Sequence, residues 1–207
     1  MTTHAQAFGA FSRPFYFTGA MTDDSKALAQ GLRRRDPDVL DGLIMQYQKR
    51  LYRYLLFLTS DRALAEDLFQ ETWIRVLERG HQYDGKSKFD SWLFAIARHL
   101  VIDVSRRKKF SSIEDLANAE SGQQYEPPDE RVASALEMLV TRENEQAVQI
   151  SLLKIAPYYR EVLLLRFQEE LGLEEIAGIL SAPISTVKSR LYRGLTALKS
   201  VLPGGAA

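Results

Sequence analysis

Polar side chains recur at helical spacing near the C-terminal end of the chain, opposite a row of leucines. They are Ser185, Lys188, Ser189, Tyr192, Arg193 and Thr196. Such groups can hydrogen-bond the edges of bases, and cations can hold the phosphates of a nucleic acid. Residues 186–199 include four cations and no acid. The pattern therefore predicts a helix face that binds DNA.

A helix-turn-helix would position these side chains. Apolar residues follow helical spacing in residues 173–180 and again in residues 187–198. Ser181, Ala182 and Pro183 interrupt the pattern, and Ser185 is the candidate N-cap of the second helix. The second helix of such a pair can enter a major groove. The alternative is an ordinary amphipathic hairpin with a solvated basic face.

A second polar cluster lies in residues 65–79. Asp67, Gln70, Glu71 and Trp73 cluster at spacings of three and four residues. Taken alone, the cluster reads as a solvated helix face. Its other reading is a docking surface for a basic partner helix, where the charges set register and association rate.

The loop GHQYDGKSK at residues 80–88 mixes rings and cations. His81, Tyr83, Lys86 and Lys88 are the side chains of interest. Bases stack on rings while lysines hold phosphates, so this composition is typical of a single-stranded nucleic-acid site. A flexible polar loop is the alternative.

The helical pattern of residues 89–109 carries charges along the side opposite its apolar face. They belong to Arg98, His99, Asp103, Arg106 and Arg107. Cations at the end of a helix are favoured by the helix dipole alone. Beside the loop, however, the same row would form a rail for a nucleic-acid backbone.

Composition limits the other classes of function. The 207 residues have zero net charge, 45% hydrophobic residues and no cysteine. Disulfides and cysteine chemistry are therefore excluded. The three histidines form no set with metal-ligand spacing, so we expect no metal, no cofactor and no enzyme activity. Neither a secretory signal nor a membrane-spanning run is evident, and we expect a cytoplasmic protein without direct membrane insertion.

The chain divides by charge and by composition into helical parts. Residues 98–109 have a balance of +4, whereas residues 111–145 have a balance of −7. We predict an all-α fold of two small domains joined by an acidic flexible linker. The predicted ranges are a disordered extension at 1–21, a helical domain at 22–110, the linker at 111–130 and a helix-turn-helix domain at 131–203. Asp61 and Asp90 are expected N-caps, and Pro157 is expected to separate two helices.

Four segments, in this order, resemble bacterial sigma factors of the extracytoplasmic-function class of the sigma-70 family. The resemblance covers about residues 36–202. AEDLFQETWIRV (65–76) is similar to the core-binding helix of sigma region two, and FDSWLFAIARHLVIDVSRRKK (89–109) to its promoter-melting part. APYYREVLLLRF (156–167) and LEEIAGILSAPISTVKSRLYRGLTALK (173–199) are similar to sigma region four.

The resemblance implies a factor that binds core RNA polymerase, directs it to specific promoters and assists promoter melting. It assigns core-polymerase contacts to Asp67, Gln70, Glu71 and Trp73. It assigns minus-ten DNA contacts to His81, Tyr83, Lys86, Lys88, Arg98, His99, Asp103, Arg106 and Arg107. It assigns minus-thirty-five DNA contacts to Ser185, Lys188, Ser189, Tyr192 and Arg193. The acidic linker would thread through polymerase channels that otherwise hold nucleic acid.

Two positions depart from the family pattern. Position 99 is His where the family commonly has Asn, and the turn carries Ser181 where many helix-turn-helices have glycine.

Members of the class are commonly held inactive by an anti-sigma factor. The resemblance therefore implies three candidate partners, which are core RNA polymerase, promoter DNA and an anti-sigma factor. The alternative function is a stand-alone helix-turn-helix regulator, which would have no need of the cluster at 67–73.

Overall fold

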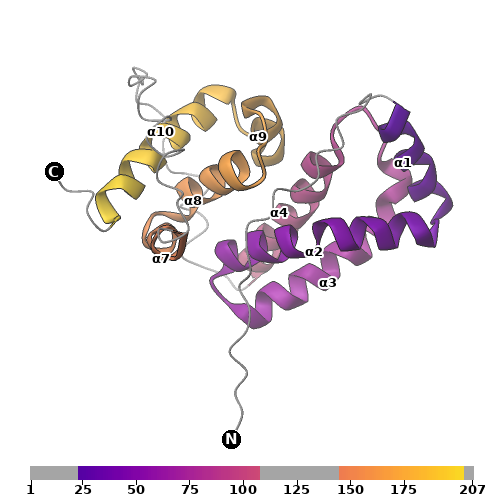
Figure 1. Cartoon of the computed structure of the whole chain (residues 1–207), viewed down its shortest axis with the longest axis horizontal. Helices are drawn as coiled ribbons and strands as arrows, with labels where there is room; N and C mark the ends of the chain where they lie inside the picture. The colour runs from indigo at the N-terminus through magenta and orange to yellow at the C-terminus, as the bar shows by residue number, and fades with distance from the viewer. Residues whose placement is uncertain (1–22, 108–144, 203–207) are drawn as a thin grey trace, which may run out of the picture.

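The computed structural model describes residues 23–107 and 145–202, and every regular element in these ranges is helical (Figure 1). They form an N-terminal unit and a C-terminal unit, as the predicted all-α fold requires. The predicted extension at 1–21, the linker at 111–130 and residues 131–144 of the last predicted domain lie outside the described residues.

The N-terminal unit contains helices α1 (Asp23–Arg34), α2 (Pro37–Thr59), α3 (Arg62–Arg79) and α4 (Phe89–Arg107), with a short 3₁₀ turn η1 (Gly80–Gln82) after α3. Local signals set two of the starts. Asp36 caps α2 by accepting from the Asp38 amide at 3.0 Å, and Pro37 occupies the first turn. The predicted N-cap of α3 is confirmed, because Asp61 accepts from the Leu64 amide at 3.2 Å.

Large apolar side chains on α2, α3 and α4 fill the core of the N-terminal unit. Leu51, Tyr54 and Leu55 of α2 are fully buried, as are Val76 of α3 and Phe94 of α4. The Tyr54 and Phe94 rings meet edge to face with centroids 5.0 Å apart. Burial of this apolar area supplies most of the free energy that holds the unit together.

The C-terminal unit contains α7 (Glu145–Lys154), α8 (Pro157–Leu163), α9 (Leu173–Leu180) and α10 (Ile184–Val201). Pro157 begins α8 and separates it from α7, as predicted. After Leu163 the chain widens into a π-helical turn, η2 (Leu164–Gln168), in which the Glu169 amide donates to the Leu164 carbonyl at 3.0 Å. This turn presents Glu169 to the N-terminal unit.

Helices α9 and α10 form the predicted helix-turn-helix. Ser181 ends α9 with φ of 50°, the left-handed conformation that glycine adopts most easily. The prediction for Ser185 is wrong: α10 begins at Ile184 with Pro183 at its N-cap, so Ser185 lies inside the first turn. The rigid φ of proline suits that entry position.

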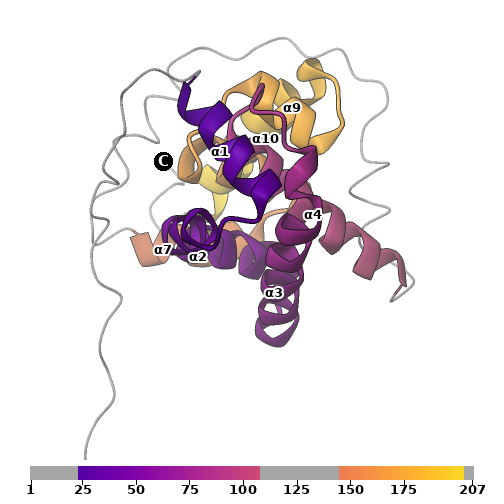
Figure 2. The same cartoon turned by 90° about the vertical axis from the view of Figure 1, so that its right-hand side faces the viewer.

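The two units pack against each other through two pairs of helices. Helix α4 lies against α9, and α2 lies against α8 (Figures 1 and 2).

The predicted N-cap role of Asp90 is also wrong, because α4 begins at Phe89 and the Asp90 carboxylate accepts hydrogen bonds from Tyr47 and Arg50 instead.

Candidate nucleic-acid interface

Helix α10 exposes the polar row that the sequence predicts. Ser185, Lys188 and Thr196 are exposed, and Ser189, Tyr192 and Arg193 are half-buried. The opposite side of the helix carries buried Val187, Leu191, Leu195 and Leu198. The amphipathic pattern therefore places the candidate base-reading side chains on the surface of the C-terminal unit.

Packing against α8 fixes the orientation of α10. A Cβ atom added to Gly194 would lie 3.2 Å from the Cβ atom of Tyr159, so glycine permits the close approach of these helices. The Arg190 guanidinium is turned inward, 5.8 Å from the centre of the Tyr158 ring, and burial lowers its pKa. Of the four cations in residues 186–199, Arg190 therefore does not belong to the exposed polar row.

The cluster on α3 combines acids with apolar side chains. Asp67 and Gln70 are exposed, and Glu71 accepts from the Arg75 Nε at 2.8 Å. Ile74 and Leu77 are 46% and 43% exposed, and their spacing from Asp67 and Gln70 puts them on the same side of the helix. Sequence reasoning missed both residues, although their helical spacing was the available signal.

Trp73 lies inside the N-terminal unit rather than on this surface. It is 7% exposed, and its ring meets that of Phe69 edge to face with centroids 6.3 Å apart. Its indole N–H has no partner among the described residues. Trp73 lies on the buried side of α3, and this position does not fit the direct polymerase contact expected for it.

The loop at 80–88 is built around a buried ring. Tyr83 is 1% exposed, and its hydroxyl donates to the Ser87 carbonyl at 2.7 Å. Its ring centre lies 5.6 Å from that of Phe89 and 5.4 Å from that of Trp92. Burial raises the pKa of Tyr83. Tyr83 therefore holds the loop together, and it does not offer its ring to a base as the sequence analysis expected.

The remaining loop side chains reach solvent. His81, Lys86 and Lys88 are exposed, and Lys86 pairs with Asp84 at 3.1 Å. Gly85 has φ of 74°, and an added Cβ would lie 2.8 Å from the Ser25 carbonyl oxygen of α1. Only glycine fits this position, and it ties the loop to α1.

Helix α4 divides its charged row between two directions. His99, Asp103, Arg106 and Arg107 are exposed, and the His99 Nδ1 lies 2.7 Å from the Ala95 carbonyl oxygen. Arg98 is buried, and its Nε donates to the Glu161 carboxylate of α8 at 2.9 Å. The exposed residues lie along one side of α4, as the predicted nucleic-acid surface requires, whereas Arg98 faces the C-terminal unit.

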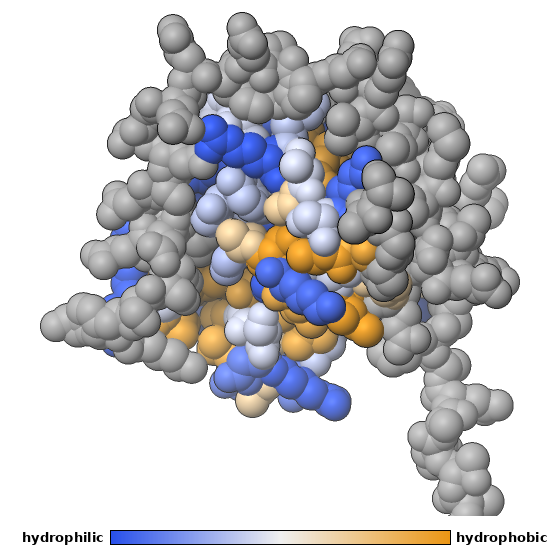
Figure 3. Space-filling view, turned by 90° about the vertical axis from the view of Figure 1, so that its left-hand side faces the viewer, coloured by the Kyte–Doolittle hydropathy of each residue, from blue (hydrophilic) through white to orange (hydrophobic). Residues whose placement is uncertain are grey.

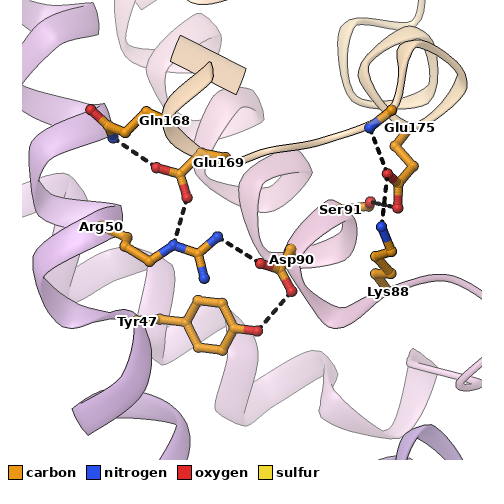
Figure 4. A network of polar contacts seen from close by, with 9 residues as sticks. Tyr47, Arg50, Lys88, Asp90, Ser91, Gln168, Glu169 and Glu175 are labelled. Atoms are coloured by element: carbon orange, nitrogen blue, oxygen red, sulfur yellow. Dashed lines mark hydrogen bonds and ion pairs between the residues drawn. The ribbon is translucent and has the colours of Figure 1, made fainter. Parts of the chain in front are cut away.

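A polar network joins the two units near the start of α4 (Figure 4). Arg50 on α2 donates to Asp90 on α4 at 2.7 Å and to Glu169 after η2 at 2.8 Å. The Tyr47 hydroxyl donates to Asp90 at 2.7 Å, and Gln168 donates to Glu169 at 2.7 Å. The sequence pattern does not indicate this network, because its members are distant in sequence and lie on different elements.

Burial governs the protonation of the network. Burial raises the pKa of Glu169, with Arg50 opposing the shift. Burial alone would lower the pKa of Arg50, but Glu169 and Asp90 raise it above its ordinary value. Burial, with Asp90 as the hydrogen-bond acceptor, raises the pKa of Tyr47. The network therefore contains a permanent cation and a neutral phenol that donates to a carboxylate.

A second buried arginine, Arg160 on α8, binds oxygens of both units. It donates to the carbonyls of Leu152 at 2.8 Å, Leu153 at 2.9 Å and Ile155 at 3.2 Å. It also donates to the Phe57 carbonyl at 2.6 Å and to the Ser60 Oγ at 3.2 Å, at the end of α2. Burial lowers its pKa.

The described ranges contain neither a metal-binding cluster nor a membrane-spanning helix. Residues 23–107 and 145–202 contain no group of three side chains able to hold a metal ion. Within the same ranges, no helix is both long and apolar enough to cross a bilayer. Seen from the left-hand side of Figure 1, hydrophobic residues lie at the surface between polar ones (Figure 3). The exposed apolar residues in the described ranges include Ile150 and Leu153 of α7.

Comparison with known proteins finds two family matches, one on each unit. Residues 43–111 match sigma-70 region 2, and residues 146–198 match sigma-70 region 4. The chain is 31% identical over 176 residues to the ECF RNA polymerase sigma factor SigW of Bacillus subtilis, covering 83% of this chain and 92% of SigW. It is 32% identical over 155 residues to SigX of the same organism, covering 74% of this chain and 78% of SigX.

Solved structures share the fold. The sigma factor RpoE of Bartonella quintana, in complex with the anti-sigma factor NepR, superposes with a TM-score of 0.58 at 19% identity, over 78% of this chain and 94% of RpoE. CnrH, in complex with the cytosolic domain of CnrY, gives a TM-score of 0.60 at 18% identity, over 86% of this chain and 97% of CnrH.

Proposed function

The chain belongs to the extracytoplasmic-function (ECF) class of the sigma-70 family, and from this we propose how its residues divide the work of a sigma factor. Its function is that of an RNA polymerase sigma factor in promoter-specific initiation. Sigma factors are not enzymes; they direct one. The observation that supports the division is that region 2 and region 4 each match one helical unit.

Helix α3 binds core RNA polymerase in this proposal. Asp67, Gln70 and Glu71 supply hydrogen bonds and charge, and exposed Ile74 and Leu77 supply apolar contact beside them. A centre of apolar contact with a polar rim is the usual anatomy of a protein interface. Trp73 contributes by packing behind the helix.

The loop after α3 and the exposed row of α4 take the minus-ten DNA. His81, Lys86 and Lys88 lie on the loop, and His99, Arg106 and Arg107 continue the row on α4. Asp103 sits among these cations, and Arg98 joins them once its contact with Glu161 is released. Phosphate and stacking contacts of this kind offset the few kcal/mol needed to unstack a base.

Helix α10 reads the minus-thirty-five DNA. Ser185, Lys188, Ser189, Tyr192 and Arg193 lie along the surface that the second helix of a helix-turn-helix inserts into a major groove. Arg193 and Lys188 can bond bidentately to guanine, and the serines can bond to either base of a pair.

We further place the domain limits at 22–110, 111–130 and 131–203 and the protein in the cytoplasm, beside the polymerase. An anti-sigma factor is a proposed partner, since the structural relative RpoE was solved with one. Core polymerase and promoter DNA are the partners of the working complex.

Run-off transcription with purified core polymerase tests the proposal, on DNA from upstream of this protein's own gene. We expect a discrete transcript that requires the protein and is lost with a double Asp67→Ala, Glu71→Ala variant. Asp41→Ala removes an exposed acid on α2 and serves as the control, which should keep full activity. If the protein bound duplex DNA specifically but never bound core polymerase, the stand-alone regulator would replace this proposal.

A further inference from the structure

Ion pairs between the two units have one polarity. In each pair that the structure describes between them, the carboxylate comes from the C-terminal unit and the cation from the N-terminal unit. The pairs are Glu161 with Arg98 at 2.9 Å, Glu169 with Arg50 at 2.8 Å and Glu175 with Lys88 at 3.2 Å. The carboxylates of one unit thus face a cationic surface of the other.

These carboxylates are held firmly where they meet the cations. The Glu169 side chain is 0% exposed and that of Glu161 is 3% exposed. The Tyr54 hydroxyl donates to Glu161 at 3.1 Å. Gln168 donates to Glu169 at 2.7 Å (Figure 4). Ser91 and the Gly172 amide both approach Glu175, at 3.4 Å and 2.7 Å. Each carboxylate is therefore held in place by at least one hydrogen-bond donor besides its cation.

Ion pairs contribute little net free energy to such a contact. Buried ion pairs lose hydration when they form, and this loss cancels much of their mutual attraction. When the units separate, the same charges regain water. A contact between domains that includes such ion pairs therefore permits opening by a partner that binds the separated form preferentially.

Two of the three cations are also proposed to bind DNA. Lys88 and Arg98 belong to the surface that takes minus-ten DNA under the proposed function, on which the present inference rests. A carboxylate oxygen lies beside each of them, and carboxylate and phosphate oxygens accept the same charge-assisted hydrogen bonds. Arg98 is buried by α8, so no DNA strand reaches it while the units are in contact.

We infer that the described arrangement is a self-inhibited form, in which Glu161 and Glu175 substitute for DNA phosphates on Arg98 and Lys88, and Glu169 clamps Arg50. The C-terminal unit then competes directly with promoter DNA for the N-terminal unit. Binding to core polymerase or to DNA opens the contact, because the open form alone offers the complete cationic surface.

The test uses full-length protein with paired fluorophores. The sequence has no cysteine, so Gln48→Cys and Ser200→Cys give unique exposed attachment sites on the two units. Energy transfer between the labels reports opening. A fluorescent single-stranded oligonucleotide of about 20 nucleotides with mixed sequence reports access to the cationic surface.

Three variants separate opening from simple loss of negative charge. The double variant Glu161→Gln, Glu175→Gln removes both phosphate substitutes but keeps oxygen acceptors for Tyr54 and for the Gly172 amide. Glu169→Gln loosens the contact without touching Lys88 or Arg98. Glu174→Gln is the matched control, since Glu174 is the exposed neighbour of Glu175 on the same turn.

We expect reduced energy transfer and roughly fivefold to tenfold tighter binding of the oligonucleotide in the double variant. Glu169→Gln should shift both readouts in the same direction, and Glu174→Gln should leave energy transfer unchanged. Adding the oligonucleotide to the unsubstituted protein should lower energy transfer as well. Circular dichroism of each variant confirms that both units remain folded.

Unchanged energy transfer in both the double variant and Glu169→Gln would overturn the inference. So would tighter binding that Glu174→Gln matched, because charge alone would then explain it. Failure of the proposed function has a different signature, the absence of core-polymerase binding and of transcript. That result leaves energy transfer as an independent measure of the contact.

Discussion

At the scale of single residues, buried arginines bind positions that are distant in sequence. Arg160 donates to carbonyls at the end of α7, to the segment before α8 and to the end of α2. Arg50 and Arg98 each hold a carboxylate of the other unit. The planar guanidinium has five donors in a fixed geometry, which a lysine cannot replace.

The Arg160→Met variant should therefore unfold at a much lower urea concentration than the unsubstituted protein. The change leaves buried carbonyls of Leu152, Ile155 and Phe57 without donors, each at a cost of about 1–3 kcal/mol. We expect a loss of at least about 3 kcal/mol of unfolding free energy in urea. Arg62→Ala is the control, since the Arg62 side chain is 83% exposed and pairs only on the surface; this substitution should barely change the urea midpoint.

Arg193 gives a prediction about specificity at the same scale. If it bonds bidentately to a base in the minus-thirty-five element, Arg193→Ala should weaken recognition there by about 1–3 kcal/mol. Binding of the polymerase holoenzyme to templates with and without that base pair measures the effect. A uniform loss on all templates would instead indicate a phosphate contact.

At the scale of elements, helical spacing predicted where helices form better than it predicted the roles of single side chains. The apolar periodicity of residues 173–198 predicted α9 and α10, and Asp61 and Pro157 marked helix starts correctly. Ser185 and Asp90 failed as caps because neighbouring residues began their helices first. Tyr83 and Trp73 were placed on the surface because a single sequence does not show which aromatic residues the tertiary packing buries.

Two glycines give opposite predictions for the helical scaffold. Gly85→Ala should destabilise the protein by more than about 1 kcal/mol, because φ is 74° and the new Cβ meets Ser25 at 2.8 Å. Gly42→Ala, inside α2 with nothing within 4 Å of the added Cβ, should stabilise by about 0.5–1 kcal/mol. Thermal unfolding of the two variants measures both. Equal shifts would mean that the loop does not depend on its contact with α1.

At the scale of the whole molecule, charge segregation matters more than net charge. The net charge is zero, yet residues 98–109 carry a balance of +4 and residues 111–145 one of −7. The contact between the units continues this segregation, with acids on one side and cations on the other. The sequence predicted the charged segments but not which of them meet, because the contact joins residues 63 to 119 positions apart.

Free protein should consequently bind duplex promoter DNA weakly. The positive surfaces are offset by acids of the same chain, so few counterions are released on binding. We expect tight and sequence-specific binding only after core polymerase is added, measured by fluorescence anisotropy at fixed salt. Tight specific binding by the protein alone, with a steep dependence on salt, would contradict this view.

The π-helical turn at Leu164–Gln168 has a consequence for how such chains diverge. A π turn holds one residue more than the α-helical turn that it replaces. The wider turn accommodates this extra residue, so deleting one codon there would restore an α-helical turn and leave the helices after it in nearly the same orientation. Loss of a single codon is a frequent event in genomes. A lineage can therefore lose the widened turn beside Glu169 in one evolutionary step, without altering any residue of α9 or α10.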